Sequence, residues 1–193
     1  MRRIADISSH EKAITMNYCP ECAGTVLLKK IEGDDRARFV CSNCQTVFYS
    51  NPKMVIGAIP EWDGKILLCR RAIEPARGKW TLPAGYLENG ETISECAVRE
   101  TREEACAVIA DLTPYALVNL PRINQVYFIF RSQLAEHKFH PGTESLEVKL
   151  FPPAEIPWKE VAFASIKEVL QLYCDDLNQK KFPFRIVDIC LER

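Results

Sequence analysis

Residues 85–107 read GYLENGETISECAVRETREEACA, and their pattern predicts a loop followed by a helix. Thr92 followed three positions later by Glu95 is a capping box, in which each side chain accepts a hydrogen bond from the other residue's backbone N–H. The box predicts a helix over Thr92–Cys106, and the residues before it form the loop that leads into that helix.

Three carboxylates lie on one face of the predicted helix. At 100° per residue, Glu100, Glu103 and Glu104 share a face with the apolar side chains, so we expect all three to point inward. Like charges at this spacing repel, and partial burial strengthens the repulsion. Mg2+ or Mn2+ would neutralise the cluster and bind diphosphate oxygens. We expect Arg99, off this face, to pair with Glu91. A solvated acidic helix balanced by its own arginines is the alternative.

Four cysteines form two C-x2-C pairs near the N-terminus. They are Cys19, Cys22, Cys41 and Cys44. Two such pairs, on strands predicted at Thr25–Lys30 and Ala37–Val40, can arrange four sulfurs tetrahedrally around one Zn2+. A site closed by four thiolates has no open position for a substrate, so we interpret the zinc as structural. Four buried or redox-active cysteines without metal are the alternative.

Composition excludes several classes of protein. The chain has 193 residues and a formal net charge of -1, which gives no basic field to attract nucleic acid or an anionic membrane. It contains no apolar run of the roughly 18 residues that can span a bilayer. The N-terminus lacks the apolar core of a signal peptide, so we expect a cytoplasmic protein. The sequence leaves open whether it is a monomer or a homodimer.

The remaining sequence predicts several strands and one further helix. Apolar, partly β-branched runs predict strands at Lys53–Ile59, Lys65–Cys69, Trp80–Ala84, Tyr115–Leu120, Gln125–Phe130 and Leu146–Phe151. Apolar residues at helical spacing predict a helix over Ala162–Gln179. Strands mixed with helices indicate a layered α/β domain.

The stretch at 85–107 resembles the Nudix box, G-x5-E-x7-R-E-U-x-E-E-x-G-U, where U is aliphatic. The matching residues are Gly85, Glu91, Arg99, Glu100, Glu103 and Glu104. Thr101 and Ala107 occupy U positions, and Cys106 replaces the last glycine, so the departures concern helix packing and the helix exit. The resemblance extends over residues 52–180. It divides the chain into an N-terminal arm (1–17, mobile or a short helix), a zinc ribbon (18–50) and a Nudix hydrolase domain (51–193).

The resemblance implies an α/β/α sandwich around a mixed sheet and attack of water on one phosphorus of X–P–P–nucleoside. The residues it implies as ligands of Mg2+ or Mn2+ are Glu100, Glu103, Glu104 and, through its backbone carbonyl, Ala84. In many Nudix enzymes a glutamate from a distant loop acts as a base or an extra ligand. Glu144 and Glu147 are the candidates here, with an exposed loop acid as the alternative.

A zinc ribbon before a Nudix domain is the layout of NADH pyrophosphatases, which carry a segment similar to SQPWPFPxS after the box. Residues 114–130 read PYALVNLPRINQVYFIF instead. The stretches YSNPKMV (49–55), WTLPAGYLE (80–88) and EIPWKEVAF (155–163) resemble a plant and bacterial group that hydrolyses FAD and ADP-ribose. These small nucleotides are therefore the expected substrates. The alternatives are NADH, the cap of an RNA end, and a regulatory module that senses a nucleotide.

Five side chains are candidates for contacts with the substrate. Arg70, Arg71 and Arg122 could bind phosphate oxygens with paired hydrogen bonds, and an ordinary surface role is the alternative for each. Trp80 and Tyr127 could stack on a flat ring, although aromatic residues at such positions are more often part of the core.

Overall fold

The computed structural model describes residues 16–190, and most of the predicted N-terminal arm lies outside this range. The chain divides into two compact units, Met1–Pro52 and Lys53–Arg193, which are described separately. No helix within residues 16–190 is long and apolar enough to cross a membrane.

The first unit contains a three-stranded antiparallel sheet, formed by β1 (Val26–Lys30), β2 (Ala37–Cys41) and β3 (Val47–Phe48). The first two strands confirm the sequence prediction to within one residue at each end. The third was not predicted, because two residues are too few to show a period. The small core of this first unit contains two cysteines of the C-x2-C pairs, Cys19 and Cys41.

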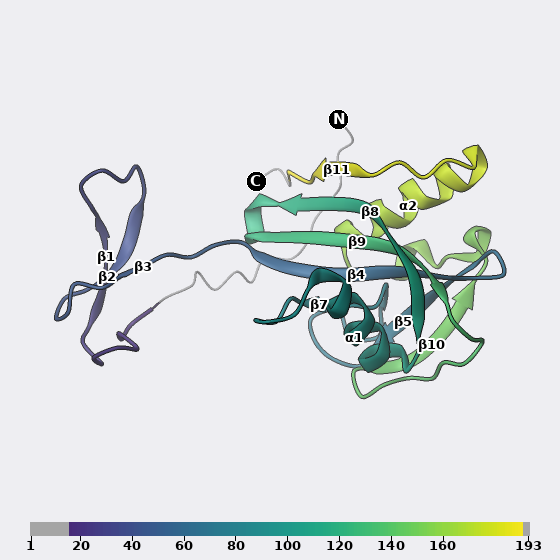
Figure 1. Ribbon diagram of the computed structural model, residues 1–193, viewed down its shortest axis with the longest axis horizontal. Coiled ribbons are helices and arrows are strands. Elements are labelled where there is room, and N and C mark those ends of the chain that lie inside the picture. Colours follow the sequence, from purple (N-terminus) through teal and green to yellow (C-terminus); the bar gives the residue numbers. More distant parts are fainter. Residues whose placement is uncertain (1–15, 191–193) are drawn as a thin grey trace. The chain divides into compact units, whose positions relative to one another are not determined.

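The second unit is built around a mixed sheet of eight strands and two helices (Figure 1). The strands are β4 (Lys53–Trp62), β5 (Lys65–Arg71), β6 (Trp80–Thr81), β7 (Ala84–Tyr86), β8 (Ile109–Leu120), β9 (Gln125–Leu134), β10 (Ser145–Phe151) and β11 (Arg185–Asp188). The helices are α1 (Ile93–Ala105) and α2 (Ala164–Gln179). The strand order is β10-β5-β4-β9-β8-β11, with β4 parallel to β9 and β11 parallel to β8.

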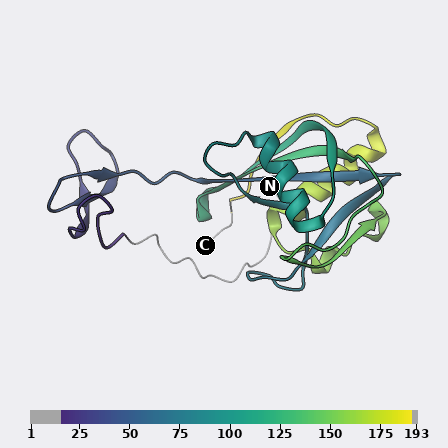
Figure 2. The ribbon, with the colours of Figure 1, turned by 60° about the horizontal axis from the view of Figure 1, so that its bottom comes forward.

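The two helices cover opposite faces of this sheet (Figures 1 and 2). Along β5, Ile66 and Leu68 belong to the core cluster that contains the apolar residues of α2. Leu67 and Cys69 belong to a cluster that contains Ala105 of α1. Because successive side chains of a strand point to opposite faces, the two clusters lie on the two sides of the sheet. The expected α/β/α sandwich is therefore confirmed.

The sheet divides between β4 and β5. These strands pair only beside their connecting turn, where Glu61 lies opposite Ile66. Farther along, β7 pairs with β4 while β6 pairs with β5. The prediction of one strand over Trp80–Ala84 was wrong in this respect, because each half follows a different one of the two diverging strands. Gly57 allows β7 to lie close against β4, since a Cβ there would lie 2.7 Å from the Cβ of Ala84.

Two further strands differ from the sequence prediction. β8 begins at Ile109, before the predicted start at Tyr115, because register shifts at Ala110/Thr113 and Pro114/Ala116 interrupt its alternating pattern. β11 was not predicted at all, since its four residues are too short to show a period and it forms by pairing with β8.

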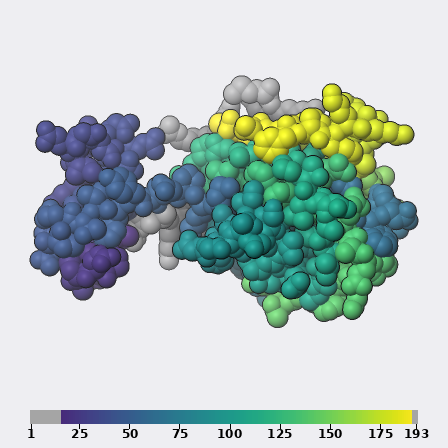
Figure 3. Space-filling view, in the orientation of Figure 1, coloured from purple at the N-terminus to yellow at the C-terminus, as the bar shows by residue number. Residues whose placement is uncertain are grey.

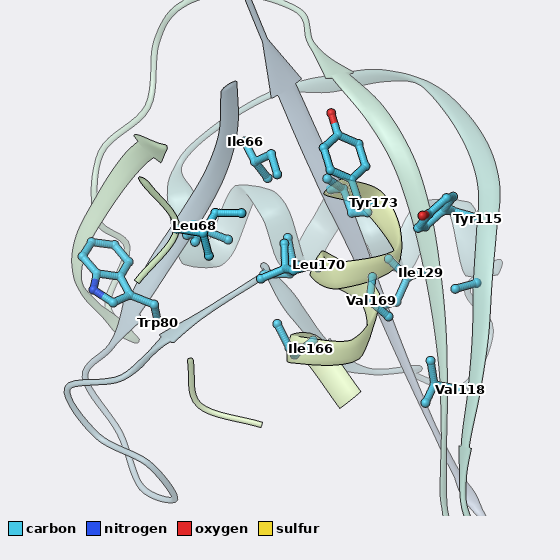
Figure 4. Packing of buried hydrophobic residues seen from close by; sticks show 14 of the residues in the cluster. Ile66, Leu68, Trp80, Tyr115, Val118, Ile129, Ile166, Val169, Leu170 and Tyr173 are labelled. Carbon is cyan, nitrogen blue, oxygen red and sulfur yellow. The ribbon is translucent and has the colours of Figure 1, made fainter. Parts of the chain in front are cut away.

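Helix α2 supplies much of the main core (Figure 4). Ile166, Val169, Leu170 and Tyr173 are each 1% exposed or less and pack onto the sheet, as their helical spacing predicts. The helix begins after Phe163, two residues later than predicted.

The ends of α1 match the sequence closely. Thr92 and Glu95 form both hydrogen bonds of the predicted capping box. Cys106 is the C-cap of α1. Its φ of 47° and ψ of 34° are the left-handed conformation that glycine adopts easily. A cysteine therefore holds the backbone geometry of the glycine that it replaces, at a cost of about 1–2 kcal/mol.

Candidate active site

Two carboxylates of α1 are buried at the division of the sheet. Glu100 is 9% exposed and Glu104 is 7% exposed, as their position on the apolar face predicts. Gly85, next to β4 in the sheet, lies against the Glu100 carboxylate so closely that any Cβ at position 85 would overlap it. The absence of a side chain at Gly85 therefore leaves the space in which this carboxylate sits.

Arg99 connects the helix to the loop before it. Its Nε and Nη2 atoms donate to the two oxygens of Glu91 at 3.0 Å and 2.7 Å, which confirms the pairing expected from the sequence. Nη2 also donates to the Tyr86 carbonyl at 3.0 Å. Nη1 donates to Glu100 at 2.6 Å. These bonds lower the pKa of Glu91 to about 2 and fix the orientation of the Glu100 carboxylate.

Glu103 differs from the expectation that all three carboxylates point inward. Its side chain is 58% exposed and receives a 3.1 Å hydrogen bond from Arg99. At 100° per residue it lies 60° to one side of Glu100, while Glu104 lies 40° to the other side. That difference places Glu103 at the border of the buried face.

Glu104 is an incompletely satisfied buried acid. Its Oε2 atom has no hydrogen-bond partner, the only such buried side-chain atom found within residues 16–190. Burial, and then the charge of Glu100, raise the pKa of Glu104 to about 8, against a hydrogen bond from the backbone of Ala84 and the charge of Arg71. Burial also raises the pKa of Glu100.

The structure distinguishes between the two candidate glutamates of the later loop. Glu144 comes two residues after Gly142, whose N–H binds the Glu104 carbonyl at 3.1 Å, and its charge raises the pKa of both Glu100 and Glu104. Glu147 lies opposite Arg70 across β10 and β5, with 3.7 Å between its carboxylate and the guanidinium. Glu147 is on the α2 side of the sheet, because it alternates with Val148, which packs on the α1 side.

The five substrate-contact candidates fall in different places. Arg71 stacks on the ring of Phe163 at 5.1 Å and acts electrostatically on Glu104. Arg70 pairs with Glu147, and Arg122 is exposed in a 3-10 turn, η1, Pro121–Ile123. Tyr127 is half-buried, with its ring against the main core. Trp80 is 6% exposed and packs edge-on against Phe151, so its ring is a core element and not a free stacking surface (Figure 4).

The buried carboxylates of α1 fit a hard divalent cation. Glu100 and Glu104 offer oxygen ligands of the type that Mg2+ and Mn2+ prefer. Glu104 also has an unpaired oxygen in a buried position, where a cation would replace the missing hydrogen bond. The sequence could not reveal which loop residues approach this cluster, because their placement depends on the pairing of β10 with β5.

The four cysteine sulfurs of the first unit fit a zinc ion. Their Sγ atoms all lie within 4.8 Å of one another. The separation is 3.6 Å between Cys19 and Cys44, and 3.5 Å between Cys22 and Cys41. Sulfurs in a tetrahedral Zn site with bonds of about 2.3 Å are about 3.8 Å apart. A disulfide would need about 2.05 Å, so these cysteines are free thiols arranged for a metal.

Residues 52–173 match the family described as the NUDIX domain, and this match covers more than half of the chain. The chain belongs to the Nudix family. Residues 17–50 match the zinc-ribbon family described as Nudix N-terminal, so the four-cysteine unit is also a known companion of this domain.

Solved structures agree with this assignment. A NUDIX hydrolase from Nitrosomonas europaea is 47% identical and superposes with a TM-score of 0.87 over 90% of this Nudix chain and 99% of its own. An ADP-ribose pyrophosphatase from Streptococcus suis, 22% identical, has the same fold, with a TM-score of 0.58 over 70% of this chain and 99% of its own.

Curated relatives match parts of the chain. The NAD-capped RNA hydrolase NudC of Photobacterium profundum is 24% identical over 163 residues, which are 82% of this chain and 59% of that protein. An ADP-ribose pyrophosphatase of Methanocaldococcus jannaschii is 45% identical over 56 residues, 29% of this chain and 33% of its own. The chain thus spans less than two thirds of the length of either relative.

Proposed function

We propose that this Nudix chain is a metal-dependent hydrolase that cleaves the diphosphate of a nucleoside diphosphate linked to another group. The observation that carries the proposal is the buried Glu104 carboxylate, whose Oε2 atom has no hydrogen-bond partner and whose pKa is raised by the charge of Glu100. A buried pair of acids without a cation is unfavourable, and a cation completes it. Glu100 and Glu104 are the principal ligands in this proposal, with the Ala84 carbonyl beside them and the exposed Glu103 contributing less.

Mg2+ or Mn2+, when bound, neutralises the charge that develops on the diphosphate and lowers the pKa of a bound water. The other roles belong to the chain. Arg99 holds Glu100 in place, and Arg71, whose charge acts on Glu104, is the candidate to bind a phosphate oxygen. Glu144, the exposed acid of the cluster, is the candidate to accept the proton of the attacking water.

FAD or ADP-ribose is the proposed substrate. The proposal rests on the stretches that resemble hydrolases of FAD and ADP-ribose, and the name of the relative from Methanocaldococcus jannaschii supports ADP-ribose. Tyr127 is half-buried against the main core, and the Phe163 ring lies under Arg71, whose charge acts on Glu104. FAD would yield FMN and AMP, and ADP-ribose would yield AMP and ribose 5-phosphate.

A second candidate substrate is the NAD group, free as NADH or at the end of an RNA. The relative from Photobacterium profundum, matched over 82% of this chain, carries the name NAD-capped RNA hydrolase and favours it. The neutral charge balance of the chain disfavours a long RNA contact. The zinc ribbon has a structural role in either proposal. The boundaries of the arm, the ribbon and the Nudix domain at residues 17 and 50 remain predictions, as does the cytoplasmic location.

One screen distinguishes these substrates. FAD, ADP-ribose, NADH and an NAD-capped RNA are each incubated with the protein and Mg2+ or Mn2+, and the products are separated by chromatography. We expect the highest kcat/KM with FAD or ADP-ribose and label from 18O-water in one phosphate product. A far higher kcat/KM for NADH or the capped RNA would exclude the first proposal, because the ratio of these constants defines specificity.

A further inference from the structure

The loop between β9 and β10 closes over the C-terminal end of α1 (Figures 1 and 3). The N–H of His140 donates to the Ala105 carbonyl at 2.9 Å, and the N–H of Gly142 donates to the Glu104 carbonyl at 3.1 Å. The last four carbonyls of a helix have no partner within it. Two of the four in α1 are thus satisfied by a segment distant in sequence, on the helix that carries the buried carboxylates.

Gly142 makes this contact possible. A Cβ at this position would overlap the carbonyl oxygen of Glu103, and it would lie 2.8 Å from the carbonyl carbon of Glu103 and 3.3 Å from that of Glu104. These are backbone atoms, which cannot move aside as a flexible side chain can. The backbone of Gly142 is not in the left-handed region, so the requirement for glycine here is space.

Glu144 follows two residues later and is held on its other side by β5. Its carbonyl accepts a 2.8 Å hydrogen bond from the N–H of Ala72. The next residue, Ser145, donates to the Gly142 carbonyl at 3.2 Å and lies opposite Arg71 in the sheet. The backbone of Glu144 is therefore fixed between the end of α1 and the end of β5.

We propose that Gly142 is a positioning residue, which places the Glu144 carboxylate beside Glu100 and Glu104 by letting the loop bind the end of α1. The backbone contact between the loop and α1 then sets the position of Glu144, the third acid. That contact is possible only because Gly142 has no side chain. The chemical role of the Glu144 carboxylate rests on the proposed function, whereas its placement by Gly142 does not.

A double-mutant cycle tests the inference without requiring turnover. The proteins are wild type, Gly142→Ala, Glu144→Gln and the double variant, with Thr143→Ala, an exposed neighbour in the same loop, as the control. Binding of Mn2+ to each zinc-loaded protein is followed by the loss of the free Mn2+ signal in electron paramagnetic resonance. kcat and KM with ADP-ribose and Mn2+ are measured in parallel.

We expect Gly142→Ala to weaken Mn2+ binding about tenfold and to lower kcat by about tenfold to a hundredfold, as misplaced supporting groups do. Glu144→Gln should do the same, and adding Gly142→Ala to it should change either quantity by less than about twofold. Thr143→Ala should behave as wild type. Wild-type Mn2+ binding and kcat in Gly142→Ala, or losses that multiply in the double variant, would overturn the inference.

The role of Gly142 can still be tested if the wild type is inactive or if Gly142→Ala does not fold. If the wild type cleaves none of the four substrates, the proposed function fails, while the Mn2+ cycle still decides the role of Gly142. If Gly142→Ala does not fold, amide hydrogen exchange of the unmutated protein decides it. The amides of His140 and Gly142 should then exchange at least tenfold more slowly than that of Thr143, and equally fast exchange would overturn the inference.

Discussion

Arg99 and Glu91 form a two-point ion pair, with the arginine Nε and Nη2 atoms 3.0 Å and 2.7 Å from the two carboxylate oxygens. One residue belongs to α1 and the other to the loop before it, so the pair joins the two parts of the box. The remaining nitrogen, Nη1, is 2.6 Å from Glu100. A single guanidinium therefore sets the position of a buried acid relative to the loop.

Replacement of Arg99 by lysine should separate charge from geometry. Lysine keeps the positive charge but has one small ammonium group, which cannot bind Glu91 and Glu100 together in this arrangement. We expect Arg99→Lys to lower kcat/KM by about tenfold or more, measured with the best substrate of the screen. Arg102→Lys, on the exposed side of the same helix, is the matched control. Wild-type activity in Arg99→Lys would show that the charge alone suffices.

Glu104→Gln should abolish most activity. The substitution keeps the shape of the side chain and removes one ligand charge, so a cation that stabilises the transition state would be misplaced. We expect a loss in kcat of about 10²-fold or more at saturating Mg2+. Glu103→Gln, which changes an exposed acid next to it, should lose less. Equal losses in the two variants would contradict the distinction between a buried and an exposed carboxylate.

Without added Mg2+ or Mn2+, Glu104 should make stability depend on pH. Its pKa is raised from 4.5 to about 8 in the folded protein, so between these values the folded state keeps a proton that the unfolded state releases. The free energy of unfolding should therefore fall as pH rises from about 4.5 to about 8, by on the order of a few kcal/mol. Urea titrations of wild type and Glu104→Gln at pH 5 and pH 8 measure this. A fall of the same size in Glu104→Gln would assign it to other groups.

The first unit should hold about one zinc ion per chain, the content of one four-thiolate site. Elemental analysis of protein purified without added metal measures this. Cys22→Ser should lose the zinc and destabilise the ribbon, whereas Cys190→Ser, at an exposed cysteine outside the cluster, should keep it. A normally folded ribbon without zinc in the wild type would exclude the structural role.

Cys106→Gly should stabilise the protein. Cys106 holds a left-handed conformation that costs a residue with a side chain about 1–2 kcal/mol, while glycine loses about 0.5–1 kcal/mol in backbone entropy. We expect the free energy of unfolding to rise by up to about 1 kcal/mol, with activity unchanged. Cys106→Ala, which removes the thiol but keeps the strain, should give no such gain. An equal gain in both variants would assign the effect to the thiol.

The parts of the fold that could be predicted from the sequence depend on local rules. The capping box of Thr92 and the helical spacing of α1 and α2 act within a few residues, and the structure confirms them. The four cysteines of the zinc site likewise lie within one short segment, so their spacing alone predicts the site.

The parts that could not be predicted depend on contacts between distant segments. The side of the sheet on which Glu147 lies follows from its pairing with Arg70, and Glu144 approaches α1 because the loop before β10 binds the end of that helix. The short strand β11 exists only because β8 pairs with it. Gly142 gave no local signal, because the atoms that require a glycine there belong to α1.

The loop contact at the end of α1 has a consequence for the order of folding. Helix α1 can form as soon as its own residues are available, but Glu144 reaches the cluster only after β10 has paired with β5. Pairings between distant segments form slowly, and during synthesis the N-terminal part of the chain emerges first. The cluster therefore lacks its third acid until residues through Phe151 have left the ribosome. Tight cation uptake by the nascent chain would then have to wait until β10 has paired with β5.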